Sequence, residues 1–404
     1  MRLHKNLVLA VLNGLQQIFN EDKYADKVVA QVLKSDKRWG SRDRGFIAET
    51  SYEIVRWKRL YATIAEVQEP YNKNDLWRIF AVWATLRGYP LPDWKPFVGT
   101  PTRRIKGRFE ALRKERKYRE SIPDWLDELG MHALGEKKWE QELEALNTMA
   151  PVVLRANTIK TLPKLLRNTL LEEKITTQFL SKYADALMLD ERSNVFSTEA
   201  FQKGLFEVQD ADSQCVAPFT QAESGMRVID ACAGAGGKSL HLAAFMQNKG
   251  QLIALDIHQY KLRELKRRAK RAGAHNIETR LIDSTKVIKK LHQTADRVLL
   301  DAPCSGFGVL RRNPDAKWKL SQEFIERILK EQQQILTQYA HMVKPGGKLI
   351  YVTCSILPQE NEAQIAQFLQ SEIGKAFSLE KEKHFWPSVH GFDGFYMARL
   401  QRAV

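Results

Sequence analysis

The spacing of apolar residues divides the chain into a helical first part and a later part in which strands alternate with helices. In residues 1–95, Ile47, Ile54 and Val55 recur at helical spacing, and few stretches alternate as a strand does. This pattern predicts an all-helical domain over residues 1–95. Residues 96–149 begin with several prolines and continue with charged helical stretches, which predicts a basic linker followed by helices.

Residues 150–215 mix short apolar runs with one helical stretch. Strand-like runs cover residues 151–157, 186–190 and 205–210, and helical spacing covers residues 162–173. The mixture predicts a small α/β module of the ferredoxin-like or RNA-recognition-motif type.

From residue 216 to residue 404, apolar strand-like runs are separated by helical stretches such as 259–273 and 321–343. Strands that alternate with helices predict a doubly wound, Rossmann-like parallel sheet with helices on both faces. In such sheets the ligand binds at the carboxyl ends of the strands. The strand-like runs are 226–232, 250–257, 277–284, 295–303 and 346–355.

A glycine-rich turn, "ACAGAGGKS" at residues 231–239, follows the first of these strands. A phosphate-binding loop would need a glycine where Cys232 stands, and a dinucleotide fingerprint would need glycine or alanine where Ser239 stands. Both motifs therefore fail at one position. What remains is a strand, a turn without bulky side chains, and a helix whose N-terminus faces a ligand.

Carboxylates follow the second and third strands. Asp256 ends the second strand, about twenty residues after the glycines, where an acidic side chain can bind a ribose diol. Asp283 ends the third strand, where it can contact a base or its sugar. Either carboxylate alone could be a helix N-cap, but the ordered set with a glycine turn favours a nucleoside-containing cofactor.

The four cysteines form no C-x-x-C pair, so they give neither a zinc signature nor a disulfide framework. Cys304 follows the fourth strand and Cys354 ends the fifth. Because these strands are expected to be neighbours, about 4.8 Å apart, both thiols should reach one side of the cleft. A lone buried cysteine is usually a small hydrophobic residue, but two at the ligand edge indicate chemistry.

The formal net charge of +15 favours a polyanionic partner. Residues 101–120 contain nine basic and three acidic residues, which form either a solvated helix face or a phosphate contact. The first twenty residues are interrupted by Asn13, Gln16 and Gln17, so an amphipathic helix fits them better than a signal peptide. With no stretch approaching a membrane span, we expect a cytoplasmic, monomeric protein without membrane contact or metal.

Three motifs, "DACAGAGGKS", "DAPCSGFGVLRRNPD" and "VTCSILPQENE", resemble those of the S-adenosylmethionine-dependent RNA 5-methylcytosine methyltransferases, the group of bacterial 16S rRNA methyltransferase B and the Nop2/Sun proteins. The first 90 residues resemble the NusB-type RNA-binding domain of its bacterial members. The resemblance implies a class I methyltransferase domain, S-adenosylmethionine as cofactor and RNA as partner. It implies cofactor contacts from Cys232, Ala233, Gly234, Ala235, Gly236, Gly237, Lys238, Asp256, Asp283 and Asp301.

The resemblance also implies roles in catalysis. Cys354 would be the thiolate that adds to carbon 6 of cytosine, and this addition makes carbon 5 reactive. Asp301 would hydrogen-bond the ring, and Cys304 would assist the final release of the enzyme. The loop residues Arg311, Arg312 and Lys317, with Trp318, could bind phosphates and stack on a displaced base, or they could form a solvated loop.

The family usually has Ala-Pro where this chain has Gly234 and Ala235, so we expect a more mobile turn and an altered cofactor affinity. We expect 16S rRNA as the substrate, with tRNA as the alternative. Two other classes stay open: a P-loop-like nucleic-acid ATPase, and a non-catalytic RNA-binding factor, although a pure binder needs neither thiol.

Overall fold

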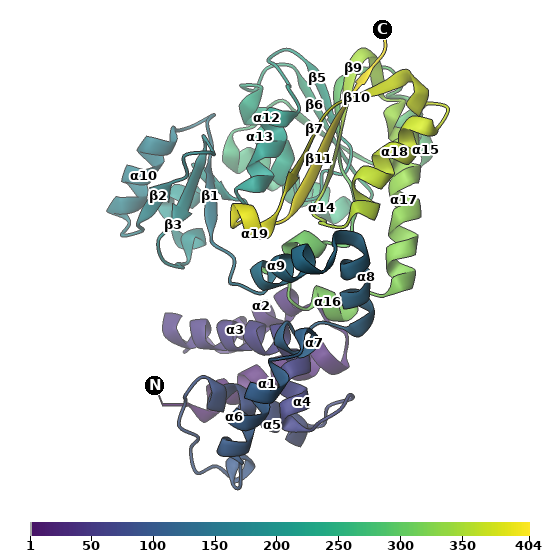
Figure 1. The fold of residues 1–404 in the computed structure, drawn as a ribbon. Coiled ribbons are helices and arrows are strands. Elements are labelled where there is room, and N and C mark those ends of the chain that lie inside the picture. The colour runs from purple at the N-terminus through teal and green to yellow at the C-terminus, as the bar shows by residue number, and fades with distance from the viewer. Residues whose placement is uncertain (1) are drawn as a thin grey trace. The chain divides into compact units, whose positions relative to one another are not determined.

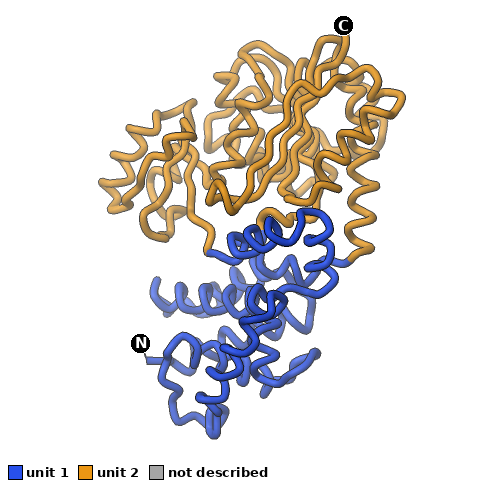
Figure 2. The backbone as a smooth tube through the Cα atoms, in the orientation of Figure 1, with its two compact units in different colours: residues 1–148, 310–321 blue, residues 149–309, 322–404 orange. Residues whose placement is uncertain are grey.

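The computed structural model describes residues 2–404, which form two compact units (Figure 2). Unit 1 contains the described residues up to Thr148 together with Leu310–Ser321. Unit 2 contains Met149–Val309 and Gln322–Val404. Among residues 2–404 there is no helix with the length and apolar character that crossing a membrane requires.

Unit 1 is helical throughout its described residues, which confirms the predicted all-helical character of the N-terminal segment. Its core is formed by buried side chains such as Ile47, Ile54 and Phe80. Asn72 caps one helix by accepting hydrogen bonds from the backbone N–H groups of Asn74 and Asp75. The relation to NusB stays a prediction. The helices are α1 (Lys5–Asn20), α2 (Ala25–Lys34), α3 (Ser41–Arg56), α4 (Lys58–Ala65), α5 (Lys73–Leu86), α6 (Thr102–Leu112), α7 (Arg116–Arg119), α8 (Asp124–Leu134), α9 (Glu136–Leu146) and α16 (Ala316–Lys319).

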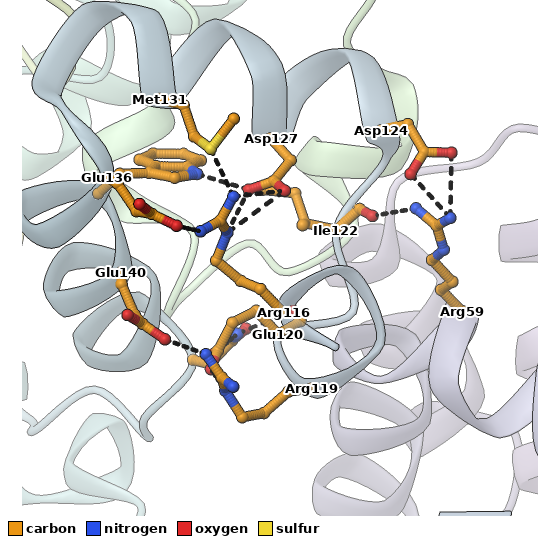
Figure 3. Close-up of polar contacts among 12 residues, drawn as sticks. Arg59, Arg116, Arg119, Glu120, Ile122, Asp124, Asp127, Met131, Glu136 and Glu140 are labelled. Atoms are coloured by element: carbon orange, nitrogen blue, oxygen red, sulfur yellow. Dashed lines mark hydrogen bonds and ion pairs between the residues drawn. The ribbon is translucent and has the colours of Figure 1, made fainter. Parts of the chain in front are cut away.

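Ion pairs engage part of the basic segment 101–120 within unit 1 (Figure 3). Arg116 on α7 lies 3.0 Å from Asp127 on α8 and 3.3 Å from Glu136 on α9, and Arg119 pairs with Glu140. These arginines therefore hold three helices together. The basic residues that stay exposed at the start of α6, and so could contact phosphates, are Arg103, Arg104 and Lys106.

Unit 2 begins with the predicted small α/β module. It is a four-stranded antiparallel sheet of order β2-β3-β1-β4, with one strand, β2, that the sequence pattern did not predict. Only one residue of β2 is buried, so its sequence carries little of the alternation that marks a strand. The strands are β1 (Val153–Ala156), β2 (Thr177–Phe179), β3 (Ala186–Leu189) and β4 (Phe206–Val208), with helices α10 (Pro163–Glu172) and α11 (Glu199–Gln202).

The second sheet of unit 2 has seven strands in the order β10-β11-β9-β8-β5-β6-β7. The five predicted strands pair in parallel, as expected, and β10 and β11, which the sequence pattern did not predict, add an antiparallel edge. The last two strands are joined by a short connection and pair as a hairpin, which requires antiparallel pairing. The strands are β5 (Arg227–Asp230), β6 (Gln251–Asp256), β7 (Ile277–Leu281), β8 (Ala295–Asp301), β9 (Val343–Thr353), β10 (Phe377–Phe385) and β11 (Phe395–Arg402).

Helices cover both faces of this sheet, which confirms the doubly wound, Rossmann-like class. Successive strand residues enter opposite cores: Ile229 packs with α17 (Gln322–Ala340) and α18 (Glu362–Gln370), and Val228 packs with α13 (Gly237–Phe245) and α14 (Gln259–Ala272). Figure 1 shows α13 and α18 on opposite sides of the strands. The carboxyl ends of β5, β6, β8 and β9 consequently meet at one edge.

Candidate active site

The glycine turn joins β5 to α13 and leaves open space on its outer side. Gly234 and Gly236 have φ values of 55° and 87°, in the left-handed region that favours glycine. A Cβ atom on Gly236 would lie 2.5 Å from Leu265, whereas a Cβ atom on Gly234 or Gly237 would meet nothing within 4 Å. The turn is therefore packed on its inner side against α14 and open where a ligand would lie.

Two arginines from outside the motif hold the turn. Arg155 on β1 donates a hydrogen bond of 2.8 Å to the carbonyl of Gly237, and Arg268 on α14 donates one of 2.8 Å to the carbonyl of Ala235. Glu207 on β4 pairs with Arg268 at 2.9 Å and lies opposite Arg155 in the small sheet. The small sheet thus supports the cofactor turn. The sequence pattern did not single out these residues; for Arg155 and Glu207 the signal was a charged residue inside a short apolar strand.

The strand-end carboxylates differ in exposure. Asp256 is buried, and its two oxygens accept hydrogen bonds from the N–H groups of Gly234, at 2.9 Å, and His258, at 2.7 Å. Asp283 is exposed at the end of β7. Asp230, which the sequence analysis did not select, ends β5; burial raises its pKa to about 7, and Ser239 donates a 2.6 Å hydrogen bond to it. The turn is therefore tied to β6 by Asp256.

Lys238 forms an ion pair with Asp301 across the edge of the sheet, with Nζ 2.7 Å from Oδ2. Burial alone would lower the pKa of Lys238, but the Asp301 carboxylate more than compensates and the pKa is raised. In a P-loop this lysine would bind a phosphate. Here its ammonium group is held by a carboxylate, which argues against the ATPase alternative.

The two thiols meet as predicted. Sγ of Cys304 lies 3.2 Å from Sγ of Cys354, because β8 and β9 are parallel neighbours. The hydrogen bond with Cys354, burial and the charge of Glu360 together raise the pKa of Cys304 well above its usual range. Cys304 is therefore held as a thiol. Burial also raises the pKa of Cys232 well above its usual range. Cys232 is therefore held as a thiol and serves as a structural residue of the turn.

The predicted RNA-binding loop lies in unit 1, and most of its side chains point into that unit. Lys317 is 3% exposed, and its ammonium donates to the carbonyl of Glu120 and to Asn147, each at 3.2 Å. Burial lowers the pKa of Lys317 well below its usual range. The Trp318 indole donates a 2.7 Å hydrogen bond to the carbonyl of Val55.

Arg311 is also buried, at 7% exposure, and bonds to Thr148. Because the donors of Arg311 and Lys317 are used within unit 1, their burial counts against RNA binding by these two side chains. For Arg312 and Trp318, which are half-buried, RNA binding stays a prediction.

A Rossmann-like sheet with a glycine turn open to a nucleoside, beside two thiols, defines the class of S-adenosylmethionine-dependent methyltransferases. Comparison with known families narrows this class. Residues 218–401 match the model of the 16S rRNA methyltransferases RsmB/F, and residues 122–196 match the ferredoxin-like domain of the same proteins. The chain belongs to the RsmB/F methyltransferase family. The predicted family and its cofactor, S-adenosylmethionine, are thereby confirmed.

Relatives carry the same family name. The probable ribosomal RNA small subunit methyltransferase B of Synechocystis sp. is 34% identical over 299 residues, which cover 70% of this chain and 67% of that protein. The protein of the same name from Bacillus subtilis is 33% identical, over 70% of this chain and 66% of that protein. The chain thus spans about two thirds of the length of these relatives.

Solved structures share the fold. The crystal structure of PH0851 superposes with a TM-score of 0.84 at 24% identity, over 100% of both chains. The structure of NSun6 from Pyrococcus horikoshii with SFG has a TM-score of 0.65 at 20% identity, over 71% of this chain and 100% of that chain.

The turn fits the cofactor of the family. The open space beside Gly234 and Gly237 would take a nucleoside, and Asp256 lies at the strand end where a ribose would bind. Gly234 occupies the position where the family has alanine, and its left-handed φ of 55° suits glycine. We propose that residues Cys232 to Lys238, with Asp256, Asp283 and Asp301, hold S-adenosylmethionine when it is bound.

Asp256→Ala is expected to raise the Kd for S-adenosylmethionine about tenfold to a hundredfold, corresponding to one charge-assisted hydrogen-bonding group of roughly 1.5 to 3 kcal/mol. The turn would also lose the tie between Asp256 and Gly234. Calorimetry measures the effect, and Glu278→Ala, an exposed position on β7, is the control. RNA affinity should stay nearly unchanged; a matching loss of RNA affinity would contradict the assignment.

Proposed function

We propose that the protein transfers a methyl group to carbon 5 of a cytosine in structured RNA, with 16S rRNA as the substrate and a covalent bond between Cys354 and cytosine as the intermediate. The observation that carries the proposal is the pair of thiols 3.2 Å apart, next to the Lys238–Asp301 ion pair at the cofactor edge. Bound S-adenosylmethionine supplies an electrophilic methyl group.

Cys354 begins the reaction as a thiolate. The ammonium of Lys238, held by Asp301 at the same edge of the sheet, would stabilise the negative sulfur. The thiolate bonds to carbon 6 of cytosine, and the ring electrons shift toward carbon 5, which then reacts as a nucleophile. Asp301 is positioned to accept a hydrogen bond from the exocyclic amine while charge builds on the ring.

The final steps need a proton acceptor and a leaving sulfur. After methylation, carbon 5 passes its proton to a water molecule, the double bond between carbons 5 and 6 re-forms as the bond between sulfur and carbon 6 breaks, and Cys354 departs as a thiolate. Cys304 lies beside this bond and assists the release. A base inside a helix would have to be flipped out or unpaired for carbon 5 to reach these groups.

The net charge of +15 and the exposed basic residues of α6 support an RNA substrate. The same chemical groups would serve a tRNA methyltransferase, so tRNA is the second candidate. A non-catalytic RNA-binding role is disfavoured because binding alone would not require two adjacent thiols and a half-buried ion pair.

Bisulfite sequencing of total RNA from cells with and without the gene tests the proposal. We expect one protected cytosine in 16S rRNA to become convertible when the gene is deleted, and to be protected again by the wild-type gene but not by Cys354→Ala. Protection lost only in tRNA would move the substrate to tRNA. An unchanged pattern in all RNA would contradict cytosine C5 methylation.

A further inference from the structure

A single buried carboxylate connects the segments that carry the two thiols. Each thiol is followed by a serine, Ser305 after Cys304 and Ser355 after Cys354, and both serine hydroxyls donate to Oε1 of Glu360 at 2.5 Å. The backbone N–H of Ser305 donates to Oε2 of Glu360 at 2.7 Å. Hydroxyl–carboxylate bonds of this length are charge-assisted and strong. Glu360 thus ties the end of β9 to the loop after β8.

Neighbouring side chains fix the carboxylate itself. Gln332 on α17 donates to Oε2 of Glu360 at 3.1 Å and to the carbonyl of Pro303 at 3.0 Å. The hydroxyl of Tyr351 donates to the backbone carbonyl of Glu360 at 2.8 Å. Glu360 is 0% exposed, so its position is set by the surrounding protein and not by solvent.

The charge of Glu360 is costly for the fold. All four groups that donate to its oxygens are uncharged, and a buried carboxylate without a counter-ion in contact is unfavourable compared with a neutral side chain. The hydrogen bond with Cys354, burial and the charge of Cys354 raise the pKa of Cys304 most, and the charge of Glu360 raises it further. A neutral amide could not make the same tie, because its NH2 group would face donors, such as the N–H of Ser305 and the amide of Gln332 at Oε2.

We propose that Glu360 is a positioning residue that holds the two thiols at contact distance and lowers the reactivity of Cys304. The carboxylate achieves the first by binding both serines and the second by its charge. The division of roles between the thiols rests on the proposed function, whereas the geometry and the charge effect do not depend on RNA.

The test compares a variant of the carboxylate with a variant of one of its ties. Glu360→Gln keeps the size of the side chain, removes the charge and replaces one acceptor oxygen by a donor. Ser355→Ala keeps the charge and removes one tie. Glu372→Gln, an exposed position in the same unit, is the control. Thermal unfolding and calorimetric binding of S-adenosylmethionine first show that each variant is folded with its cofactor site intact.

Two thiol measurements are made without RNA. In Glu360→Gln, alkylation of Cys304 by iodoacetamide at pH 8, followed by mass spectrometry, should be at least threefold faster than in the wild type. In Ser355→Ala, oxidation by diamide, which takes two hydrogen atoms from the thiols as the disulfide forms, should couple Cys304 to Cys354 at least threefold more slowly. Glu372→Gln should match the wild type in both.

A turnover measurement links the thiols to catalysis. Glu360→Gln should lower kcat for RNA methylation at least tenfold while KM changes less than twofold. Unchanged Cys304 alkylation in Glu360→Gln together with unchanged coupling in Ser355→Ala would overturn the proposal. If Glu360→Gln does not fold, the Ser355→Ala coupling rate decides. If the thiol measurements change as expected but Cys304→Ala forms no covalent adduct with RNA, the proposed function fails and the positioning role of Glu360 stands.

Discussion

Cys304→Ala is expected to accumulate a covalent protein–RNA complex, and Cys354→Ala is expected to form none and to lose at least about a thousandfold in activity. Without Cys354 there is no sulfur to add to carbon 6, so carbon 5 stays unreactive. Without Cys304, attack and methyl transfer can still proceed, but release is slowed and RNA stays attached through Cys354. A denaturing gel with labelled RNA and S-adenosylmethionine shows the complex as a slowly migrating band.

Controls separate this outcome from general effects of losing a thiol. Cys215→Ala removes a half-buried cysteine whose pKa burial raises to about 11, and it should behave as the wild type. The double variant of Cys304 and Cys354 should give no band. A band with Cys354→Ala alone would exchange the roles of the two thiols. Full activity in both single variants would show that the thiols only pack the protein.

The pattern of parallel strands made much of this site predictable. In a parallel sheet, the residues at the carboxyl ends of neighbouring strands meet at one edge whatever their separation in sequence. Cys304 and Cys354 are 50 positions apart, yet their neighbouring strands bring them into contact. The same rule placed Asp256 next to the glycine turn. For these residues, the local sequence pattern and the strand topology were sufficient to predict their positions in the site.

Other parts of the site depend on contacts that no local pattern encodes. Arg155 reaches Gly237 from a different sheet. In the sequence, Glu360 is one of two glutamates in the stretch "PQENE", and only the fold shows that two serine hydroxyls bind it. The antiparallel β10 and β11 were missed because a strand pattern does not specify the direction of its partner. Each of these features depends on contacts between segments that are far apart in the sequence. The local sequence is compatible with several structures, and these contacts select one of them.

In the loop after Cys304, local composition predicted exposed residues that the fold instead buries. Its basic residues have the composition of an RNA-binding loop, but Asp315 accepts a 2.9 Å hydrogen bond from the N–H of Ala25, the first residue of α2. Lys317 is buried in the same unit. Basic composition predicts exposure on average, and a buried lysine is the exception that requires several polar partners, here the carbonyl of Glu120 and Asn147.

Asp301→Asn is expected to lower kcat about 10²- to 10³-fold, because it removes a carboxylate that faces the developing charge of the ring and also the partner of Lys238. RNA affinity should change little, since neither side chain lies on the basic surface of α6. Single-turnover methylation with labelled S-adenosylmethionine measures the chemical step. Equal losses in kcat and in RNA affinity would instead indicate a binding role for Asp301.

The pH dependence of stability gives an independent test of the same ion pair. In the wild type the raised pKa of Lys238 lies above its unfolded value of 10.5, so Lys238 stays protonated in both states from pH 7 to 9 and adds almost no slope there. In Asp301→Asn the effect of burial is no longer opposed by the carboxylate, and the pKa of Lys238 should fall below its unfolded value. The unfolded state then binds more protons, so the free energy of unfolding should rise with pH relative to the wild type. Adding Lys238→Met should abolish that rise, whereas parallel curves for Asp301→Asn and the wild type would show that Asp301 does not hold the charge of Lys238.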